Sequence, residues 1–330
     1  MATLYIDEPG AHLSKRGECL LVQKDDRLLA EVELVQVDRV VISGHAGLTS
    51  AALTALLFQG IDCILLDFRG QYLGRLVGRE SPHVALRRAQ YALVAEPERA
   101  LALARTFVAA KLANCRVLLL RNGDRSVPAV TEAVAALEQA VERARTAADA
   151  ASLLGVEGAA TRAYFGALPI PDRDSWGFSQ RARRPPPDPV NAALSLAYTL
   201  LCSEAISAVA IAGFDPHCGF YHADAYGRPS LALDLMEQFR PVIADSVVIT
   251  LFGRGMVSRD DFAPDNGGVY LTERLRERFY RLFEERMLTR VAAGPSGEHL
   301  SYRQVLRRHA QALARAVLDP SAPYQPFTWR

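Results

Sequence analysis

Residues 40–76, VVISGHAGLTSAALTALLFQGIDCILLDFRGQYLGRL, contain the pattern that decides the fold of the first part of the chain. The β-branched run 40–42 and the apolar run 63–66 are typical of buried strands. Between them, residues 49–58 begin with a threonine, carry apolar side chains at helical spacing and stop before Gly60. This pattern predicts one helix inserted between two strands.

Further strand-like runs lie on both sides of this stretch. Residues 19–22 and 28–37 are rich in β-branched and apolar side chains, and residues 67–70 followed by 71–77 predict a hairpin. We therefore expect residues 1–80 to form a β-rich domain with one inserted helix.

The pattern of residue types changes after residue 80. Residues 78–83 interrupt both periodicities and include Pro82, which is typical of a linker. Beyond it, Ala, Leu, Arg and Glu recur at helical spacing. The expected helices are 85–94, 98–120, 129–154, 190–211, 231–243, 270–289 and 301–318. The sequence therefore predicts an α+β fold in which residues 81–330 form a larger all-helical domain.

The bulk composition is that of an ordinary folded protein. The 330 residues are 50% hydrophobic and 23% charged, which excludes disordered and fibrous classes. The N-terminus lacks the basic start and apolar run of a signal peptide, and charges interrupt the other apolar stretches, so we expect a cytoplasmic protein without a membrane segment. The five cysteines include no close pair, which predicts neither a disulfide framework nor a zinc knuckle.

Charge is distributed unevenly along the chain. The net charge of +1 does not by itself predict a polyanionic partner. Counting Lys and Arg against Asp and Glu gives −3 for residues 1–84 and +4 for residues 85–330. Any DNA-binding surface is therefore expected in the second part.

Two segments place polar side chains in settings suited to a site. In residues 154–165, Glu157 lies in a helix of small residues, where Gly158 leaves room for a substrate. The alternative is that this carboxylate only stabilises a helix N-terminus. The loop 213–224 contains two histidines and two acids, and such loops present side chains to clefts. The alternative for His222 is an ordinary hydrogen-bonding surface residue.

A third segment, residues 228–241, predicts a short helix that begins at Ser230 as N-cap and ends at its final proline. Asp234 and Glu237 share one face of this helix. Arg240 could pair with Glu237 on a solvated face, but the apolar neighbours favour burial. Buried acids need a cation or many hydrogen bonds.

Together, Glu157, His222 and Glu237 supply two carboxylates and one imidazole. This set suits Mg²⁺ or Mn²⁺. Such an ion can neutralise a phosphodiester and activate an attacking oxygen. The residues predict a metal-dependent phosphodiester enzyme, provided that the three segments meet.

These segments resemble the first family of CRISPR-associated proteins, the adaptation integrases, and the resemblance covers nearly all of the chain. The matching stretches are GVEGAATRAYF around Glu157, PPPDPVNAALSLAYTLL at 185–201, GFDPHCGFYHADAYGRPSLALDLMEQFRPVIAD at 213–245, residues 40–76, and Lys111, Asn114 and Arg121. A match of this length is far more specific than a motif of two residues at a fixed spacing.

The resemblance implies a β-sandwich-like N-terminal domain before the helical one. It also implies that Glu157, His222 and Glu237 are the metal ligands, with Mg²⁺ or Mn²⁺ as cofactor. Some relatives have Asp in place of the last ligand. Asp234 matches a further acid of the motif and is expected to have an auxiliary catalytic role.

The resemblance further implies an assembly for spacer acquisition in antiviral defence. Two homodimers, each formed through the β-rich domain, would flank a dimer of the second CRISPR-associated protein, Cas2, and hold a prespacer duplex. A DNA 3′-hydroxyl would then attack the boundary of the CRISPR repeat by transesterification. A Cas4-type nuclease is a possible additional partner.

Two groups of arginines are candidates for contacts with DNA phosphates. The first lies in the proline-rich loop and the second in the last predicted helix; they are Arg181, Arg183 and Arg184, and Arg303, Arg307 and Arg308. The alternative for both groups is a solvated charged surface.

Two other functions stay open at this point. A metal-dependent nuclease could cut DNA without joining ends, because water can replace the DNA hydroxyl. A catalytically silent DNA-binding scaffold could also retain the acids for structural reasons.

Overall fold

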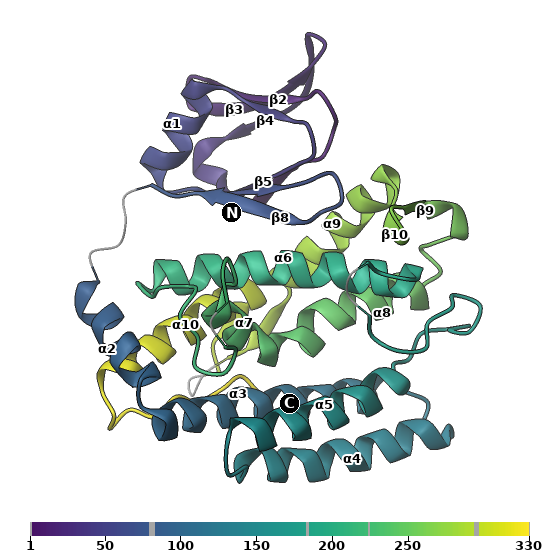
Figure 1. The fold of residues 1–330 in the computed structure, drawn as a ribbon. Coiled ribbons are helices and arrows are strands. Elements are labelled where there is room, and N and C mark those ends of the chain that lie inside the picture. The colour runs from purple at the N-terminus through teal and green to yellow at the C-terminus, as the bar shows by residue number, and fades with distance from the viewer. Residues whose placement is uncertain (1, 79–82, 183–184, 224, 294–296, 330) are drawn as a thin grey trace.

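The computed structural model describes residues 2–78, 83–182, 185–223, 225–293 and 297–329. Most strands lie in the first quarter of the chain, and helices dominate from residue 84 onward (Figure 1). This arrangement confirms the predicted mixed α+β class.

The N-terminal part is built from two four-stranded sheets. The first has the order β1 (Ala2–Ile6), β5 (Val37–Ser43), β7 (Asp62–Leu66), β8 (Tyr72–Leu76), and the second β4 (Arg27–Glu33), β3 (Cys19–Lys24), β2 (His12–Arg16), β6 (Gly47–Leu48). Their shared core includes the fully buried Leu13, Leu20, Val40 and Cys63. The predicted run 28–37 is not one strand, because the 3₁₀ turn Leu34–Gln36 separates β4 from β5.

The inserted helix α1 (Ser50–Gln59) has the ends that the sequence predicts. The Thr49 side chain accepts a hydrogen bond from the Ala52 backbone N–H, and Gly60 adopts the left-handed conformation at φ 68°. The predicted hairpin is also confirmed, since β7 and β8 pair antiparallel.

The second part contains nine α-helices in the described residues. They are α2 (Val84–Val94), α3 (Pro97–Asn122), α4 (Pro128–Arg145), α5 (Ala150–Gly166), α6 (Pro189–Ile211), α7 (Ser230–Met236), α8 (Ser246–Gly253), α9 (Glu273–Leu288) and α10 (Tyr302–Leu318). Two short hairpins, β9 (Phe262–Asp265) with β10 (Gly268–Leu271) and β11 (Arg290–Ala292) with β12 (His299–Ser301), flank α9. The predicted single helix 129–154 is wrong, because the carboxylate of Asp149 caps a new helix by accepting from the Ser152 N–H.

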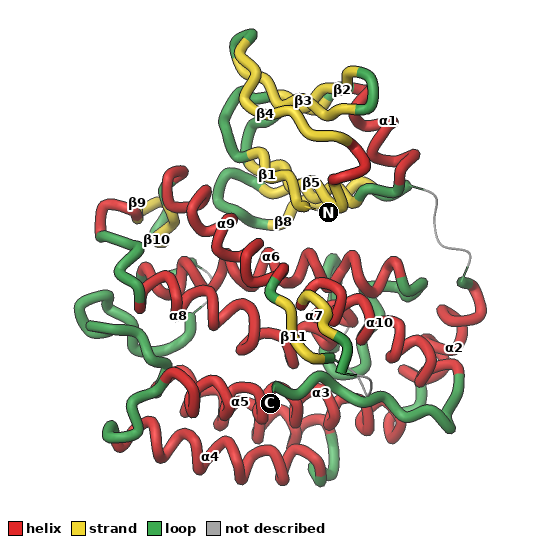
Figure 2. Tube along the Cα trace, turned by 180° about the vertical axis from the view of Figure 1, so that it is seen from behind, coloured by secondary structure: helices red, strands yellow, loops and turns green. Residues whose placement is uncertain are grey.

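Helix α6 spans the side of the helical part that faces the strands and lies directly below them (Figure 1), as the view from behind also shows (Figure 2). By length and composition it is the one helix of the described residues that could cross a membrane, but 67% of its most apolar window is buried inside the protein. We therefore interpret α6 as a core helix. The last described residues lie beside α3 in both views.

The helix that carries Glu237 does not begin or end as predicted. Pro229, and not Ser230, is the N-cap, and the helix continues past Pro241. After α7 the backbone tightens into the 3₁₀ turn Glu237–Phe239 and then widens into the π-helix Arg240–Asp245 before α8. A proline cannot supply the N–H of a regular α-helix and would clash with the preceding turn. The change of helix type accommodates it, and π segments often occur at functional sites.

A buried charge network joins the strands to the helices. Arg39 of β5 contacts Glu204 of α6 at 2.5 Å and Asp62 of β7 at 3.3 Å. Glu204 also contacts Arg303 of α10 at 2.7 Å, and Arg303 contacts Glu284 of α9 at 2.8 Å. Burial by itself raises the pKa of Glu204, but the two arginines outweigh it and lower the pKa to about 2.

Candidate metal and phosphodiester site

The three predicted ligands come together beside α3. Glu157 lies on α5, His222 on the loop before α7, and Glu237 on the 3₁₀ turn after it. The Nε2 atom of His222 lies 3.8 Å from Oε1 of Glu237. Lys111 of α3 lies between the carboxylates, with its Nζ 2.7 Å from Oε2 of Glu237 and in a short ion pair with Glu157.

Glu237 is buried, with only 1% of its surface exposed. Its Oε1 accepts a 2.8 Å hydrogen bond from Nε of Arg240, and Lys111 lies on its other side. Burial raises the pKa of Glu237, but Arg240 and Lys111 outweigh it and hold the pKa well below its usual range. Arg240 is itself buried and stacks over Tyr198 at 4.6 Å, so the pair is not on a solvated face.

Glu157 does not serve the N-terminus of its helix, because Asp149 caps α5. One carboxylate oxygen of Glu157 contacts Lys111, and the other accepts a short hydrogen bond from the Tyr221 hydroxyl. Burial, and then Glu157, raise the pKa of Tyr221 far above its usual range. Tyr221 is therefore a protonated donor that orients Glu157.

Asp234 is fully buried and organises the loop that carries His222. Its Oδ2 accepts from the backbone N–H groups of Phe220 and Tyr221, at 2.6 and 3.0 Å. Its Oδ1 accepts from the backbone N–H of His222 at 2.9 Å and lies 2.7 Å from Nδ1 of the same residue. Because Asp234 accepts a hydrogen bond at this position, the proton of the His222 ring is placed on Nδ1. Nε2 is then unprotonated on the side of the ring near Glu237.

Glu157, His222 and Glu237 offer two carboxylates and one imidazole nitrogen, which are donors that a divalent ion such as Mg²⁺ or Mn²⁺ takes. Among the described residues, no group of three or more His, Cys, Asp or Glu side chains holds a metal-binding arrangement as it stands, and the Lys111 ammonium lies between the two carboxylates. Yet Oε2 of buried Glu237 receives no well-directed hydrogen bond, although Lys111 is 2.7 Å away. The 2.7 Å distance describes an ionic contact. The residues therefore fit Mg²⁺ or Mn²⁺ if the ammonium moves.

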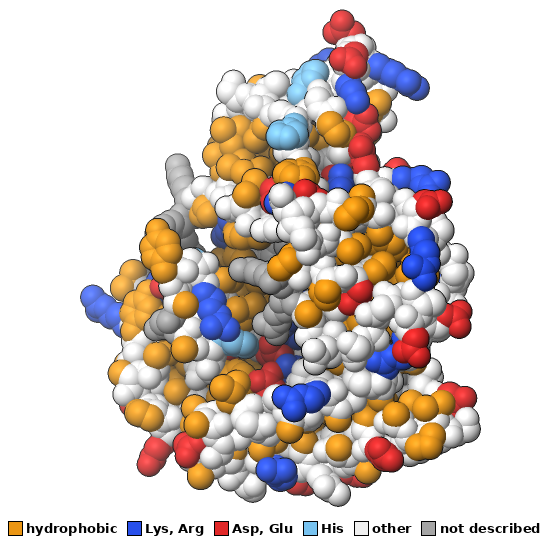
Figure 3. Space-filling view, turned by 45° about the vertical axis from the view of Figure 1, so that its right-hand side comes forward, with side chains coloured by type: hydrophobic (Ala, Val, Ile, Leu, Met, Phe, Trp, Pro, Cys, Tyr) orange, Lys and Arg blue, Asp and Glu red, His pale blue; other side chains and the backbone are white. Residues whose placement is uncertain are grey.

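A cavity of about 310 Å³ adjoins this cluster. Its lining includes four cationic side chains, Lys111, Arg162, Arg181 and Arg240. Asp245 lies at its wall, where burial raises its pKa to about 6 while two tyrosine hydroxyls donate to it at 2.7 Å each. A space with this lining suits an anionic group such as a phosphodiester. Figure 3 shows acidic, basic and histidine side chains gathered in a hollow of the helical part.

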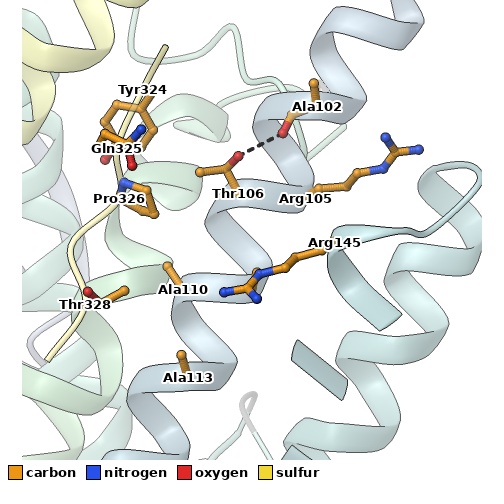
Figure 4. Close-up of a pocket in the computed structure, with 11 residues that line it drawn as sticks. Ala102, Arg105, Thr106, Ala110, Ala113, Arg145, Tyr324, Gln325, Pro326 and Thr328 are labelled. Carbon is orange, nitrogen blue, oxygen red and sulfur yellow. Dashed lines mark hydrogen bonds between the residues drawn. The ribbon is translucent and has the colours of Figure 1, made fainter. Parts of the chain in front are cut away.

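A larger cavity, of about 560 Å³, contains none of the predicted ligands. It lies between the Ala110 side of α3, Arg145 at the end of α4 and the C-terminal residues around Pro326 (Figure 4). The cavity beside the predicted ligands is therefore the smaller of the two, and its cationic lining distinguishes it from the larger one.

The predicted arginines have different environments. Arg181 lines the cavity beside Lys111 and donates to Asn191 at 2.8 Å. Arg183 and Arg184 lie outside the described residues. Arg308 is exposed and paired with Glu298 at 3.0 Å, and Arg307 is half-buried.

The prediction for Arg303 as a DNA contact is wrong for this structure. Only 3% of its surface is exposed, and its guanidinium is shared between Glu204 and Glu284. Helix periodicity identified a basic face, but it could not show that acids from two other helices cover part of it.

Sequence reasoning did not assign roles to Lys111 and Tyr221. The sequence does contain a signal for Lys111, because this residue is the only lysine after residue 24 in a chain whose other basic residues there are arginines. Tyr221 had none beyond its position next to His222, since a loop tyrosine has many ordinary roles.

Comparisons with known proteins identify the family of the chain. The family described as CRISPR associated protein Cas1 matches residues 4–285. The chain is 38% identical over 332 residues to "CRISPR-associated endonuclease Cas1 3" of Thermus thermophilus, covering 100% of this chain and 98% of the relative. It is 39% identical to "CRISPR-associated exonuclease Cas4/endonuclease Cas1 fusion" of Geobacter sulfurreducens, covering 99% of this chain but only 60% of the fusion.

Two solved structures are similar over the whole chain. "Casposase bound to integration product" matches with a TM-score of 0.85 at 23% identity, covering 100% of this chain and 95% of that one, which shows the fold alone. "Cas6-RT-Cas1--Cas2 complex" matches with a TM-score of 0.82 at 26% identity, covering 99% of this chain and 36% of that one. By its sequence match and its fold, the chain belongs to the Cas1 family of CRISPR-associated proteins.

Proposed function

We propose that this chain is a metal-dependent DNA integrase of CRISPR adaptation, which joins prespacer 3′-hydroxyl ends to the repeat by transesterification. One observation carries the proposal: Glu157, His222 and Glu237, from three separate segments, converge beside a cavity with a cationic lining. Relatives named as endonucleases support phosphodiester chemistry at such a site.

Mg²⁺ or Mn²⁺ bound by these three residues would neutralise charge on the phosphodiester and favour ionisation of the attacking hydroxyl. The protein's own groups prepare that arrangement. Asp234 fixes the imidazole of His222, Tyr221 orients Glu157, and the arginines of the cavity would hold a phosphate in place.

A covalent route through Tyr221 has little support. Its hydroxyl donates to Glu157, and its raised pKa makes ionisation unfavourable at neutral pH. The attacking oxygen is therefore external, and a DNA 3′-hydroxyl or water can supply it.

The assembly belongs to the same proposal. We infer a homodimer through the N-terminal part, where large apolar side chains are exposed: Phe58 at 88%, Leu73 at 67% and Val77 at 51%. Hydrophobic side chains gather on this part of the surface in Figure 3. The solved complex that contains Cas2 and the natural fusion to Cas4 support Cas2 and a Cas4-type nuclease as partners.

DNA contacts are proposed for five of the predicted arginines. Arg181 is supported by its position on the cavity wall, whereas Arg307 and Arg308 are supported only by their access to solvent. Arg183 and Arg184 stay predictions from the sequence.

The test uses two labelled duplexes that differ only at the 3′ end, one with a hydroxyl and one with a dideoxy end. Each is incubated with the protein, its Cas2 partner, Mn²⁺ and a plasmid carrying the repeat. We expect joined product only from the hydroxyl substrate. His222→Ala and Glu157→Gln should abolish joining, while His217→Ala, an exposed histidine of the same loop, should retain it.

The same experiment separates the alternatives. Equal cleavage of both duplexes without joining would establish a metal-dependent nuclease, because water is insensitive to the 3′ block. Metal-independent binding without any product would establish a scaffold.

A further inference from the structure

The basic residues of this chain are almost all arginine. Only Lys15, Lys24 and Lys111 are lysines, against 35 arginines. Lys15 and Lys24 lie in the N-terminal sheets, where each has an acidic neighbour within 4 Å. Lys111 is the single lysine of the helical part of the sequence, and it lies at the proposed ligands. A lysine offers a compact charge on a flexible stem, whereas arginine offers a rigid planar fork.

The Lys111 ammonium is the internal counter-ion of the carboxylate pair. Its Nζ forms a short contact with Glu157 and lies 2.7 Å from Oε2 of Glu237. The three side chains are 9%, 13% and 2% exposed, respectively. Two carboxylates that share one ammonium in such a poorly solvated place would repel strongly without a cation between them.

A divalent ion and this ammonium cannot occupy the same space. Mg²⁺ binds carboxylate oxygens at about 2.1 Å, so an ion shared by Glu157 and Glu237 would take the position that Nζ holds. The two cations would also repel each other at short range. The Lys111 side chain already forms part of the wall of the 310 Å³ cavity, so the ammonium has open space into which it can turn.

We propose that Lys111 is an exchangeable counter-ion: its ammonium neutralises Glu157 and Glu237 in the metal-free protein and turns into the adjoining cavity when a divalent cation binds. In the cavity it joins Arg162, Arg181 and Arg240 around the phosphate-sized space. Metal loading thereby moves one positive charge from the ligands toward the DNA phosphate. This inference rests on the proposed metal site.

Because the chain has only three lysines, the movement can be followed directly in the wild-type protein. Full-length protein labelled with carbon-13 at lysine Cε should give three lysine Cε resonances, and Lys111→Arg identifies the one that belongs to Lys111. Titration with Mg²⁺ should shift the Lys111 resonance, and the Mg²⁺ concentration at half of the shift should agree with the Kd for Mg²⁺ measured by calorimetry. Lys15 and Lys24 serve as internal controls and should not shift.

Metal affinity gives an independent measurement. Lys111→Met removes the competing charge while keeping an unbranched apolar stem that ends where the ammonium begins, so the Kd for Mn²⁺ measured by calorimetry should fall about tenfold or more. Glu237→Gln should abolish Mn²⁺ binding in the same assay.

The outcomes separate this inference from the metal site itself. If wild type binds Mg²⁺ and Mn²⁺ in calorimetry and Glu237→Gln binds neither, but the Lys111 resonance stays fixed during the Mg²⁺ titration, the counter-ion exchange is refuted and the metal site stands. If wild type binds neither ion, the proposed site fails and the exchange fails with it. A Lys111→Met protein that binds Mn²⁺ more weakly than wild type would also overturn the exchange.

Discussion

Asp234→Asn tests whether the loop that carries His222 depends on one buried carboxylate. In the wild type each oxygen of Asp234 faces two N–H groups, those of Phe220 and Tyr221 on one side and two from His222 on the other. Asparagine keeps one oxygen and places an NH₂ group against the remaining pair of donors. If the NH₂ group faces Phe220 and Tyr221, both of their backbone N–H groups lose their acceptor. If it faces His222, the backbone N–H of His222 loses its acceptor, and Nδ1 can accept from the amide only without its proton.

The structure gives the size of the effect. Each unsatisfied buried group costs about 1–3 kcal/mol, so the loss of one or two acceptors should lower the free energy of unfolding by about 2–4 kcal/mol. If the amide NH₂ faces Nδ1 of His222, the ring proton must move to Nε2, which removes the lone pair turned toward Glu237. Loss of such a supporting group weakens metal binding by about 10–100-fold.

Urea unfolding and Mn²⁺ calorimetry on wild type and Asp234→Asn measure both effects. Asp215→Asn is the matched control, because Asp215 lies in the same loop and, among the described residues, its carboxylate accepts from the Tyr91 hydroxyl and the His217 N–H, one for each oxygen. The control should stay within about 1 kcal/mol of wild type. If Asp234→Asn bound Mn²⁺ with wild-type affinity and lost less than about 1 kcal/mol of stability, the assigned role of Asp234 would be wrong.

Two further predictions concern stability and loop packing. Glu204→Gln should lower the free energy of unfolding by about 3 kcal/mol at neutral pH, from the displacement of its pKa from 4.5 to about 2. A carboxylate whose pKa is lowered by folding contributes its full stability only above the pH at which the unfolded chain ionises, so the difference in unfolding free energy between wild type and Glu204→Gln should close between about pH 5 and pH 2. Glu138→Gln is the control, because its side chain is 64% exposed and its loss should change the unfolding free energy little. An equal loss of stability in both variants would contradict the role of the buried network. Gly219→Ala should lower stability by about 1–3 kcal/mol and weaken Mn²⁺ binding, because the added Cβ would lie 2.7 Å from Cβ of Ser230. Gly155→Ala, where a Cβ meets nothing within 4 Å, should not destabilise α5, and a Gly219→Ala protein as stable as this control would refute the close packing.

Local signals in the sequence predicted much of the secondary structure. The ends of α1 follow from Thr49 and Gly60, because caps act within one turn of the chain. The break between α4 and α5 had a similar signal in Asp149 followed three residues later by Ser152, which the helical periodicity obscured. No local signal predicted that the helical segment continues past Pro241, since a proline usually ends a helix. Only the surrounding packing stabilises the 3₁₀ and π turns there.

The sequence by itself determined the mixed fold class, the family and the residue types available for chemistry, because these depend on short-range pattern and on the identity of side chains. Only the tertiary structure decided that Glu157, His222 and Glu237 meet, that Lys111 lies between the carboxylates, and that Arg303 is buried. Each of these results depends on contacts between residues far apart in the chain. Whether a charged side chain faces water, an acid or a substrate depends on which distant segment packs against it, and periodicity along one helix contains no information about that neighbour.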